Sequence, residues 1–110
     1  MADTLGAFEQ AVMLAIVRLG DGAYGRAILK EVEDRMKRDV AAGAVHATLD
    51  RLENKGLVSS RLEQGTAIRG GRARRFYRLR AAGVHALNDA REAVDALWHG
   101  LRWPLKPTTH

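Results

Sequence analysis

Arginines concentrate in one short part of this 110-residue sequence. Between Arg61 and Arg80 there are seven arginines and one acid, Glu63, so the local charge is +6. The whole chain has a formal charge of +5, so the other ninety residues are close to neutral. Guanidinium groups stay charged at physiological pH and bind phosphate well. Clustered cations therefore favour a nucleic acid as the partner over a solvated surface of mixed sign.

The sequence contains no set of residues that indicates catalysis. The absence of cysteine excludes disulfides, thiolate nucleophiles and cysteine-ligated zinc. His85, Glu92 and His99 recur every seven residues, and on one helix that spacing separates neighbours by about 10.5 Å, too far for one metal ion. No nucleophile with a base and an orienting group is visible. We therefore expect no enzymatic activity, no cofactor and no metal.

A candidate recognition helix precedes the arginine-rich stretch. In residues 42–58, AGAVHATLDRLENKGLV, the apolar Val45, Leu49 and Leu52 fall on one helical face, and Gly56 is a typical helix stop. The other side carries small, polar or cationic residues, namely Ala44, Ala47, Thr48, Asp50, Arg51, Asn54 and Lys55. Such a helix suits a DNA major groove, although most amphipathic helices only pack.

The neighbouring elements support recognition. A helix over Tyr24–Met36 joined to the candidate helix by a turn over Lys37–Ala41 forms a helix-turn-helix unit. Two alternating strands follow, and the glycine-containing segment between them is expected to be a mobile hairpin tip. A basic strand pair directly after a recognition helix is a wing. The other predicted elements are helices over Leu5–Leu19 and from Ala81 to about Arg102, and strands over Val58–Glu63 and Arg74–Arg80.

The last predicted helix carries an apolar seam with 3-4 spacing, broadened by Val84 and Trp98. Three helices and a hairpin already close a core, so this seam needs another partner. The same helix of a second subunit supplies one in a two-fold dimer, and the alternative is a helix folded back on its own domain.

Size and composition complete the expected organisation. No apolar run approaches 18 residues and no export signal is visible, so we expect a cytoplasmic protein without a membrane partner. The expected fold is mainly α (α+β), a winged helix-turn-helix with a two-stranded wing and a C-terminal dimerisation helix. The expected divisions are 1–80 for the DNA-binding domain, 81–103 for the dimerisation helix and 104–110 for a disordered tail.

These pieces resemble the PadR-like transcriptional regulators, specifically the short kind with one C-terminal helix. The resemblance rests on AYGRAILKEVE, GAVHATLDRLENKGLV and RGGRARRFYRL followed by AAGVHAL, and covers nearly everything from Leu5 to Leu101. It implies a winged-helix homodimer that binds palindromic operators in double-stranded DNA and usually represses. The alternative, a winged-helix module that binds protein and not DNA, is disfavoured by the basic wing.

The resemblance also implies roles for particular residues. The DNA-binding candidates are Tyr24, Gly25, Ala44, His46, Ala47, Thr48, Arg51, Arg69, Arg72, Arg74 and Arg75. The dimer-interface candidates are Leu5, Phe8, Val12, Leu87, Ala90, Val94, Leu97, Trp98 and Leu101. The family usually has tyrosine at the position of His46, so a phosphate or base contact there would be weaker or would depend on pH near neutrality.

Some short members of the family bind flat aromatic compounds between their C-terminal helices through paired tryptophans. By analogy, Trp98 with Phe8 and Val12 could bind a small aromatic effector. The alternative is that Trp98 only packs the dimer. Trp103, which precedes Pro104, is expected to be a loose cap.

Overall fold

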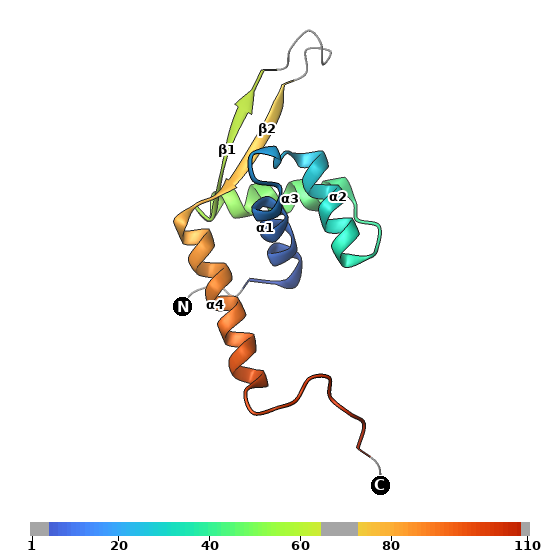
Figure 1. Ribbon diagram of the computed structural model, residues 1–110. Coiled ribbons are helices and arrows are strands. Elements are labelled where there is room, and N and C mark those ends of the chain that lie inside the picture. Colours follow the sequence, from blue (N-terminus) through green and yellow to red (C-terminus); the bar gives the residue numbers. More distant parts are fainter. Residues whose placement is uncertain (1–4, 65–72, 109–110) are drawn as a thin grey trace.

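The computed structural model describes residues 5–64 and 73–108, which form a small helical body, a protruding strand pair and a helix that extends away from the body (Figure 1). A short 3-10 turn, η1 (Gly20–Gly22), follows the first helix. The elements are α1 (Ala7–Leu19), α2 (Gly25–Met36), α3 (Ala42–Asn54), the antiparallel strands β1 (Val58–Glu63) and β2 (Arg74–Leu79), and α4 (Ala81–Trp98). This is the α+β winged helix-turn-helix expected from the sequence.

One apolar core holds α1, α2 and α3 together. Its largest side chains, each less than 2% exposed, come from every helix of the body and from the first residue of β1: Met13, Ile28, Leu49, Leu52, Val12, Val32 and Val58. Burying one such side chain stabilises the fold by about 1.5–3 kcal/mol. Burial of the apolar stripes on the three helices is therefore the main source of stability in the body.

The turn between α2 and α3 sets where the candidate recognition helix begins. Lys37 adopts a left-handed conformation, with φ of 55°, and ends α2. The carboxylate of Glu33 then accepts a hydrogen bond of 3.0 Å from the backbone N–H of Val40. Ala41 precedes α3 in an extended conformation without a side-chain cap. The side chain of Glu33 on α2 therefore holds the turn that leads into α3.

The wing is attached to the body as well as to itself. β1 and β2 pair in a register that runs from Val58 opposite Leu79 to Glu63 opposite Arg74. The N–H of Tyr77 donates a 2.8 Å hydrogen bond to the carbonyl of Ala23, just before α2, and the Tyr77 side chain is buried. The base of the wing is therefore fixed relative to the helix-turn-helix unit.

A buried carboxylate connects α1 to α3. Glu9 accepts hydrogen bonds from the Arg51 Nε at 3.4 Å and the Lys55 Nζ at 3.3 Å, and from the backbone N–H of Gly6 at 3.1 Å. Burial by itself would raise the pKa of Glu9, but the Gly6 N–H, Lys55 and Arg51 together lower it below its ordinary value. The carboxylate stays charged because three donors replace the water it has lost.

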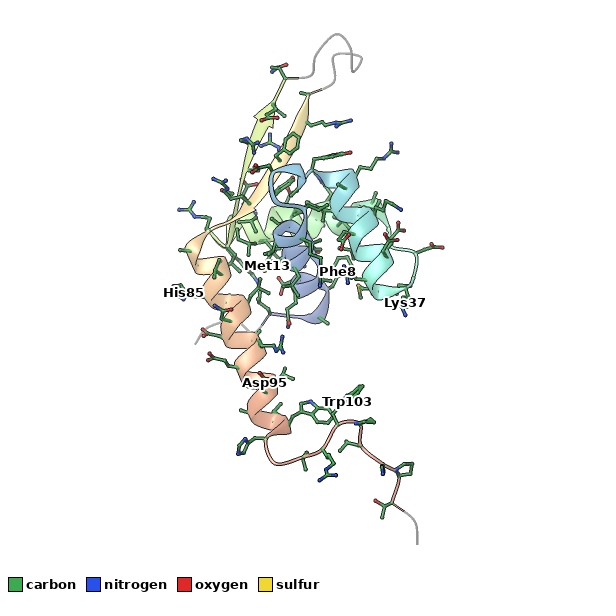
Figure 2. All side chains as sticks on the ribbon, in the orientation of Figure 1. Phe8, Met13, Lys37, His85, Asp95 and Trp103 are labelled. Carbon is green, nitrogen blue, oxygen red and sulfur yellow. The ribbon has the colours of Figure 1, made fainter. Side chains whose placement is uncertain are left out.

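Only the first turns of α4 pack on the body. Gly83 is buried, and a Cβ there would collide with the carbonyl oxygen of Leu57 and lie 3.2 Å from the Met13 Cε. Figure 2 shows His85 on the first turns of α4 and Asp95 on the part that extends away from the body. Every residue from 91 to 108 is exposed.

Four predicted boundaries are corrected. The second helix begins at Gly25 and not at Tyr24, because Tyr24 is extended and precedes the first turn. The first helix begins at Ala7 and not at Leu5, because the carboxylate of Glu9 caps the N–H of Gly6. The second strand ends at Leu79 rather than Arg80, since the Arg80 N–H turns to the Leu57 carbonyl. The last helix ends at Trp98 and not near Arg102. The chain turns out there at Gly100, with φ of 83°, and the Leu101 N–H closes the turn on the Trp98 carbonyl at 2.8 Å.

Within residues 5–64 and 73–108, none of the helices has the length and hydropathy needed to cross a bilayer.

The packing of Gly83 predicts a clear stability difference between two helical glycines. Gly83→Ala should lower the free energy of unfolding by about 1–3 kcal/mol, because the added methyl group meets the Leu57 backbone, which cannot move aside cheaply. Gly43→Ala is the matched control, since a Cβ there meets nothing within 4 Å and alanine is the better helix former. Urea unfolding at fixed protein concentration measures both. Equal stability of the two variants would contradict the packing.

The Glu9 contacts predict how stability depends on pH. A carboxyl whose pKa is lowered by folding stabilises the protein above its unfolded-state pKa, near 4.5 here, and this contribution is lost as pH falls through the folded-state pKa. Glu9→Gln should therefore cost roughly 1–3 kcal/mol at pH 7 and progressively less below pH 4.5.

Chemical unfolding of wild type and Glu9→Gln between pH 7 and pH 3 measures this difference. Asp34→Asn is the matched control, because Asp34 makes an exposed ion pair with Lys30 within α2. Removing that pair should cost about 0.5 kcal/mol or less. A cost for Glu9→Gln that stays constant over this pH range would exclude the proposed stabilising role of its charge.

Candidate nucleic-acid interface

The exposed side of α3 is built from small side chains over its first two turns. Ala44, His46 and Ala47 are all exposed, and the His46 Nε2 lies 3.8 Å from the Asp50 carboxylate one turn later. Short side chains let a helix backbone approach base edges closely, whereas long ones would hold it away. The exposed surface of these two turns therefore consists of small side chains and the imidazole of His46.

Thr48 does not belong to this exposed face, which corrects the expectation from the sequence. Its exposed fraction is 3%, and its Oγ1 accepts a 3.3 Å hydrogen bond from the Arg51 Nη2. Thr48 follows Val45 by three residues, which places it only about 60° from Val45 around the helix axis. It therefore lies on the core side of α3 and positions Arg51.

Arg51 is held toward α1. Its Nε reaches the Glu9 carboxylate, its Nη2 reaches Thr48, and half of its side chain is exposed. A guanidinium has five donors in a planar fork, so two of these contacts leave other N–H groups available. Arg51 therefore has a fixed direction and retains donors for an anion.

Two cations and two aromatic rings form a row between the wing and the start of α2, in the order Arg74, Tyr24, Phe76 and Arg61. The Arg74 guanidinium lies 4.4 Å from the centre of the Tyr24 ring, and the Arg61 guanidinium lies 5.1 Å from the centre of Phe76. The two rings meet edge to face with centres 5.6 Å apart, and Tyr24 and Phe76 also form an isolated β-bridge. Each cation–π contact contributes about 0.5–1 kcal/mol at an exposed site. The row fixes two wing arginines relative to the start of α2.

The remaining predicted DNA contacts are placed as follows. Arg75 is exposed, and its Nη1 donates a 3.0 Å hydrogen bond to the Ser60 hydroxyl, which in turn donates to Glu53 at 2.7 Å. Gly25 is exposed at the first residue of α2, directly after Tyr24. Arg69, Arg72 and the predicted hairpin tip lie outside the described residues.

The predicted dimer residues separate into two groups. Leu5 and Val12 are 6% and 0% exposed within the single chain, so they belong to its own core and offer almost no surface to a second subunit. This also removes Val12 from the predicted effector site. Phe8, Leu87 and Ala90 are half-buried, and the first two pack on the core. Val94, Leu97, Trp98 and Leu101 are exposed, although Leu101 lies beyond the end of α4.

Two structural features were not predicted from the sequence. Glu9 could have been noticed as the one acid in a mostly apolar first helix, where a buried carboxylate requires a partner. The pairing of Tyr24 with Phe76 carries no comparable signal, because it joins residues about fifty positions apart across the wing register.

Comparison with known proteins agrees with this geometry. Residues 13–89 match the family model described as the transcriptional regulator PadR-like family. No curated protein matches the sequence significantly.

Among solved structures, the chain is similar to a PadR family transcriptional regulator from Eggerthella lenta, with 28% identity, a TM-score of 0.65 and coverage of 81% of this chain and 75% of that one. It is also similar to RosR from H. salinarum, with 28% identity, a TM-score of 0.68 and coverage of 93% and 84%. A PadR-like regulator from Bacillus cereus shares the fold at 19% identity, with a TM-score of 0.66 and coverage of 86% and 94%.

The family match covers more than half of the sequence, and the PadR family regulator from Eggerthella lenta shares the fold. The chain therefore belongs to the PadR-like family of DNA-binding transcriptional regulators and is not an enzyme.

Proposed function

We propose that this regulator is a homodimeric repressor of a palindromic operator in double-stranded DNA. The observation that carries the proposal is the exposed, small-residue face of α3, followed in the chain by a wing in which Arg61 and Arg74 lie over aromatic rings. In this arrangement Ala44, His46 and Ala47 enter the major groove. A dimer that binds in this way contacts two half-sites of the operator whose centres lie one helical turn apart, at about 34–36 Å.

Affinity and sequence selection come from different elements. Between Ala42 and Asn54, α3 carries Asp50 and Glu53 against Arg51, so it supplies no excess of positive charge. Phosphate contacts therefore come from Arg74 and Arg75, with Arg69 and Arg72 of the same segment, and from Tyr24 and Gly25 at the start of α2. Arg51 contacts a phosphate from the side of α3. Selection rests on groove contacts of a few short side chains.

Dimerisation follows from the exposed end of α4. Val94, Leu97 and Trp98 are 48%, 79% and 37% exposed, and large apolar side chains in one patch mark an interaction surface. The proposed division is residues 1–80 for DNA binding and residues 81–103 for dimerisation. A two-fold dimer presents two equivalent α3 helices, which matches a palindrome.

Release from the operator would come from a small aromatic effector bound between the two copies of Trp98, with Phe8 near the site. Trp98 keeps more than a third of its surface exposed in the single chain, and Phe8 is half-buried. An effector that fits one spacing of the two winged domains better than another shifts their equilibrium.

DNA binding should respond to single arginines in a predictable way. Arg75→Ala is expected to weaken binding to the regulator's own upstream DNA and to unrelated DNA by the same factor. It should reduce the slope of log affinity against log salt by about one, because one phosphate contact is lost. Fluorescence anisotropy at several salt concentrations measures both quantities.

Lys30→Ala is the matched control for charge, since Lys30 lies on α2 and pairs with Asp34 in solvent. It should leave the affinity for DNA and the slope of log affinity against log salt unchanged. The wild type should bind each palindromic operator as two chains. Affinity that does not vary with salt, or equal effects of the two variants, would refute the proposed contact.

The effector site has a spectroscopic test. In a Trp103→Phe background, Trp98 is the only tryptophan, so a planar aromatic compound stacked on it should quench most of the fluorescence in a saturable way. The same compound should weaken operator binding, and Trp98→Ala should abolish that effect. Quenching that rises linearly with compound, with no change in DNA affinity, would leave Trp98 as a packing residue only.

A further inference from the structure

A chain of two hydrogen bonds joins the end of α3 to both strands of the wing. It runs from Glu53 of α3 through Ser60 of β1 to Arg75 of β2. The Ser60 hydroxyl lies 2.7 Å from the Glu53 Oε2 and 3.0 Å from the Arg75 Nη1. We call these three residues the α3–wing relay. Hydrogen bonds of these lengths are well formed, so all three side chains have defined directions.

The register of the wing explains why Ser60 can reach Arg75. Ser60 stands opposite Tyr77 and Leu62 stands opposite Arg75, so Ser60 and Arg75 are diagonal neighbours. Positions two apart on a strand point to the same face, so these four side chains share one face of the strand pair. A diagonal neighbour is within reach of a side chain as long as arginine. Tyr77 is 4% exposed, so at the base of the wing this face is turned toward the body.

The chemistry of the three groups fixes the direction of both hydrogen bonds. A guanidinium can only donate, and an ionised carboxylate can only accept. The Ser60 hydroxyl therefore gives its one proton to Glu53 and accepts a hydrogen bond from Arg75. Alanine has neither function, whereas threonine has both. The relay thus requires a hydroxyl group at position 60.

The relay orients Arg75 without neutralising its charge. Within residues 5–64 and 73–108, the Arg75 side chain forms no ion pair, and the Ser60 hydroxyl is its one hydrogen-bond partner. Arg61 in the same wing instead pairs with the Glu63 carboxylate at 3.0 Å. A guanidinium has five N–H donors, so most of those of the exposed Arg75 remain available for a phosphate.

Two acids of α3 lie near Arg75 and would attract it. Burial raises the pKa of the Tyr77 hydroxyl, and the charge of Arg75 opposes this shift. The charges of Asp50 and Glu53 add to the shift, so all three charged groups are close to the same phenol. Without the Ser60 hydroxyl, Coulomb attraction would draw the Arg75 guanidinium toward these carboxylates. The hydroxyl between them prevents that direct pairing.

We propose that Ser60 and Glu53 are positioning residues for DNA binding, which hold the Arg75 guanidinium where it meets a phosphate while α3 enters the groove. This inference rests on the proposed function, because it uses the phosphate contact of Arg75. Glu53 belongs to α3 and Arg75 to the wing, so the relay ties that contact to the position of the recognition helix. Folding then orders the long Arg75 side chain before DNA binds, which lowers the entropy cost of binding.

A double-mutant cycle tests whether Ser60 acts through Arg75. The variants are Ser60→Ala, Arg75→Ala and the two together, and fluorescence anisotropy measures their dissociation constants for the regulator's own upstream DNA at one salt concentration. We expect Ser60→Ala to weaken binding about three- to tenfold when Arg75 is present, because an unrestrained arginine must be ordered on binding. In the Arg75→Ala background, Ser60→Ala should change the dissociation constant by less than about twofold.

Ser59→Ala is the matched control. Ser59 precedes Ser60 on β1 and is half-buried like it, but it stands opposite Arg78, so its side chain lies on the other face of the wing. This variant should bind DNA within about twofold of wild type. Ser60→Thr should also bind as wild type does, since threonine supplies the same donor and acceptor and suits a strand. Urea unfolding of each variant checks that it is folded.

The cycle separates failure of this inference from failure of the proposed function. Suppose that Arg75→Ala weakens binding and that Ser60→Ala weakens it by the same factor in both backgrounds. Ser60 then has only a structural role, so the inference is overturned and the proposed phosphate contact stands. Unchanged or tighter binding by Ser60→Ala also overturns the inference alone. If Arg75→Ala binds as tightly as wild type, the proposed contact and the inference both fail.

A second measurement needs no DNA. Nitrogen-15 relaxation of the arginine side chains reports how far the Nε–H group of Arg75 is ordered on the picosecond to nanosecond timescale. Its order parameter should fall in Ser60→Ala and stay at the wild-type value in Ser59→Ala. Equal order of the Arg75 side chain in wild type and Ser60→Ala would overturn the proposal.

Discussion

The Glu9 carboxylate is the polar contact on which the arrangement of α1 and α3 depends. It is almost enclosed, with 11% of its side chain exposed, and it joins residues more than forty positions apart. A buried charge is costly unless it is fully paired, so this one constrains the helices to positions where Arg51 and Lys55 both reach it. The direction of Arg51 on α3 thus depends on a residue in α1.

The basic charge of the wing is more ordered than its sequence indicates. Arg61 and Arg74 lie over the aromatic rings of Phe76 and Tyr24, and Arg75 is held by Ser60. A cation over an aromatic face keeps its charge while losing freedom of movement. These guanidinium groups are therefore held at fixed positions, and in the proposed function this reduces the entropy that the wing loses when DNA binds.

The single chain has a buried core, whereas part of its apolar surface remains exposed. The body buries the core side chains of α1, α2 and α3, whereas α4 packs through Gly83 at one end and is wholly exposed from residue 91 onward. A helix that is half-covered by its own domain provides a rigid support for its exposed half. In the proposed dimer, the exposed half of α4 is consequently where contacts with a second subunit would set the spacing of the two winged domains.

The sequence by itself determined the element order, the wing, the core stripes of α1 to α3 and the family, because hydrophobic periodicity, glycine stops and charge clustering are local signals. It did not determine which residues of a stripe face inward when two surfaces compete. Val12 and Leu5 were assigned to a dimer but lie in the core, and Thr48 was placed outward but lies inward. The Glu9 contacts with Arg51 and Lys55, the Tyr24–Phe76 contact and the close approach at Gly83 were decided only by tertiary structure, because each joins residues distant in sequence through a geometry that no local pattern encodes.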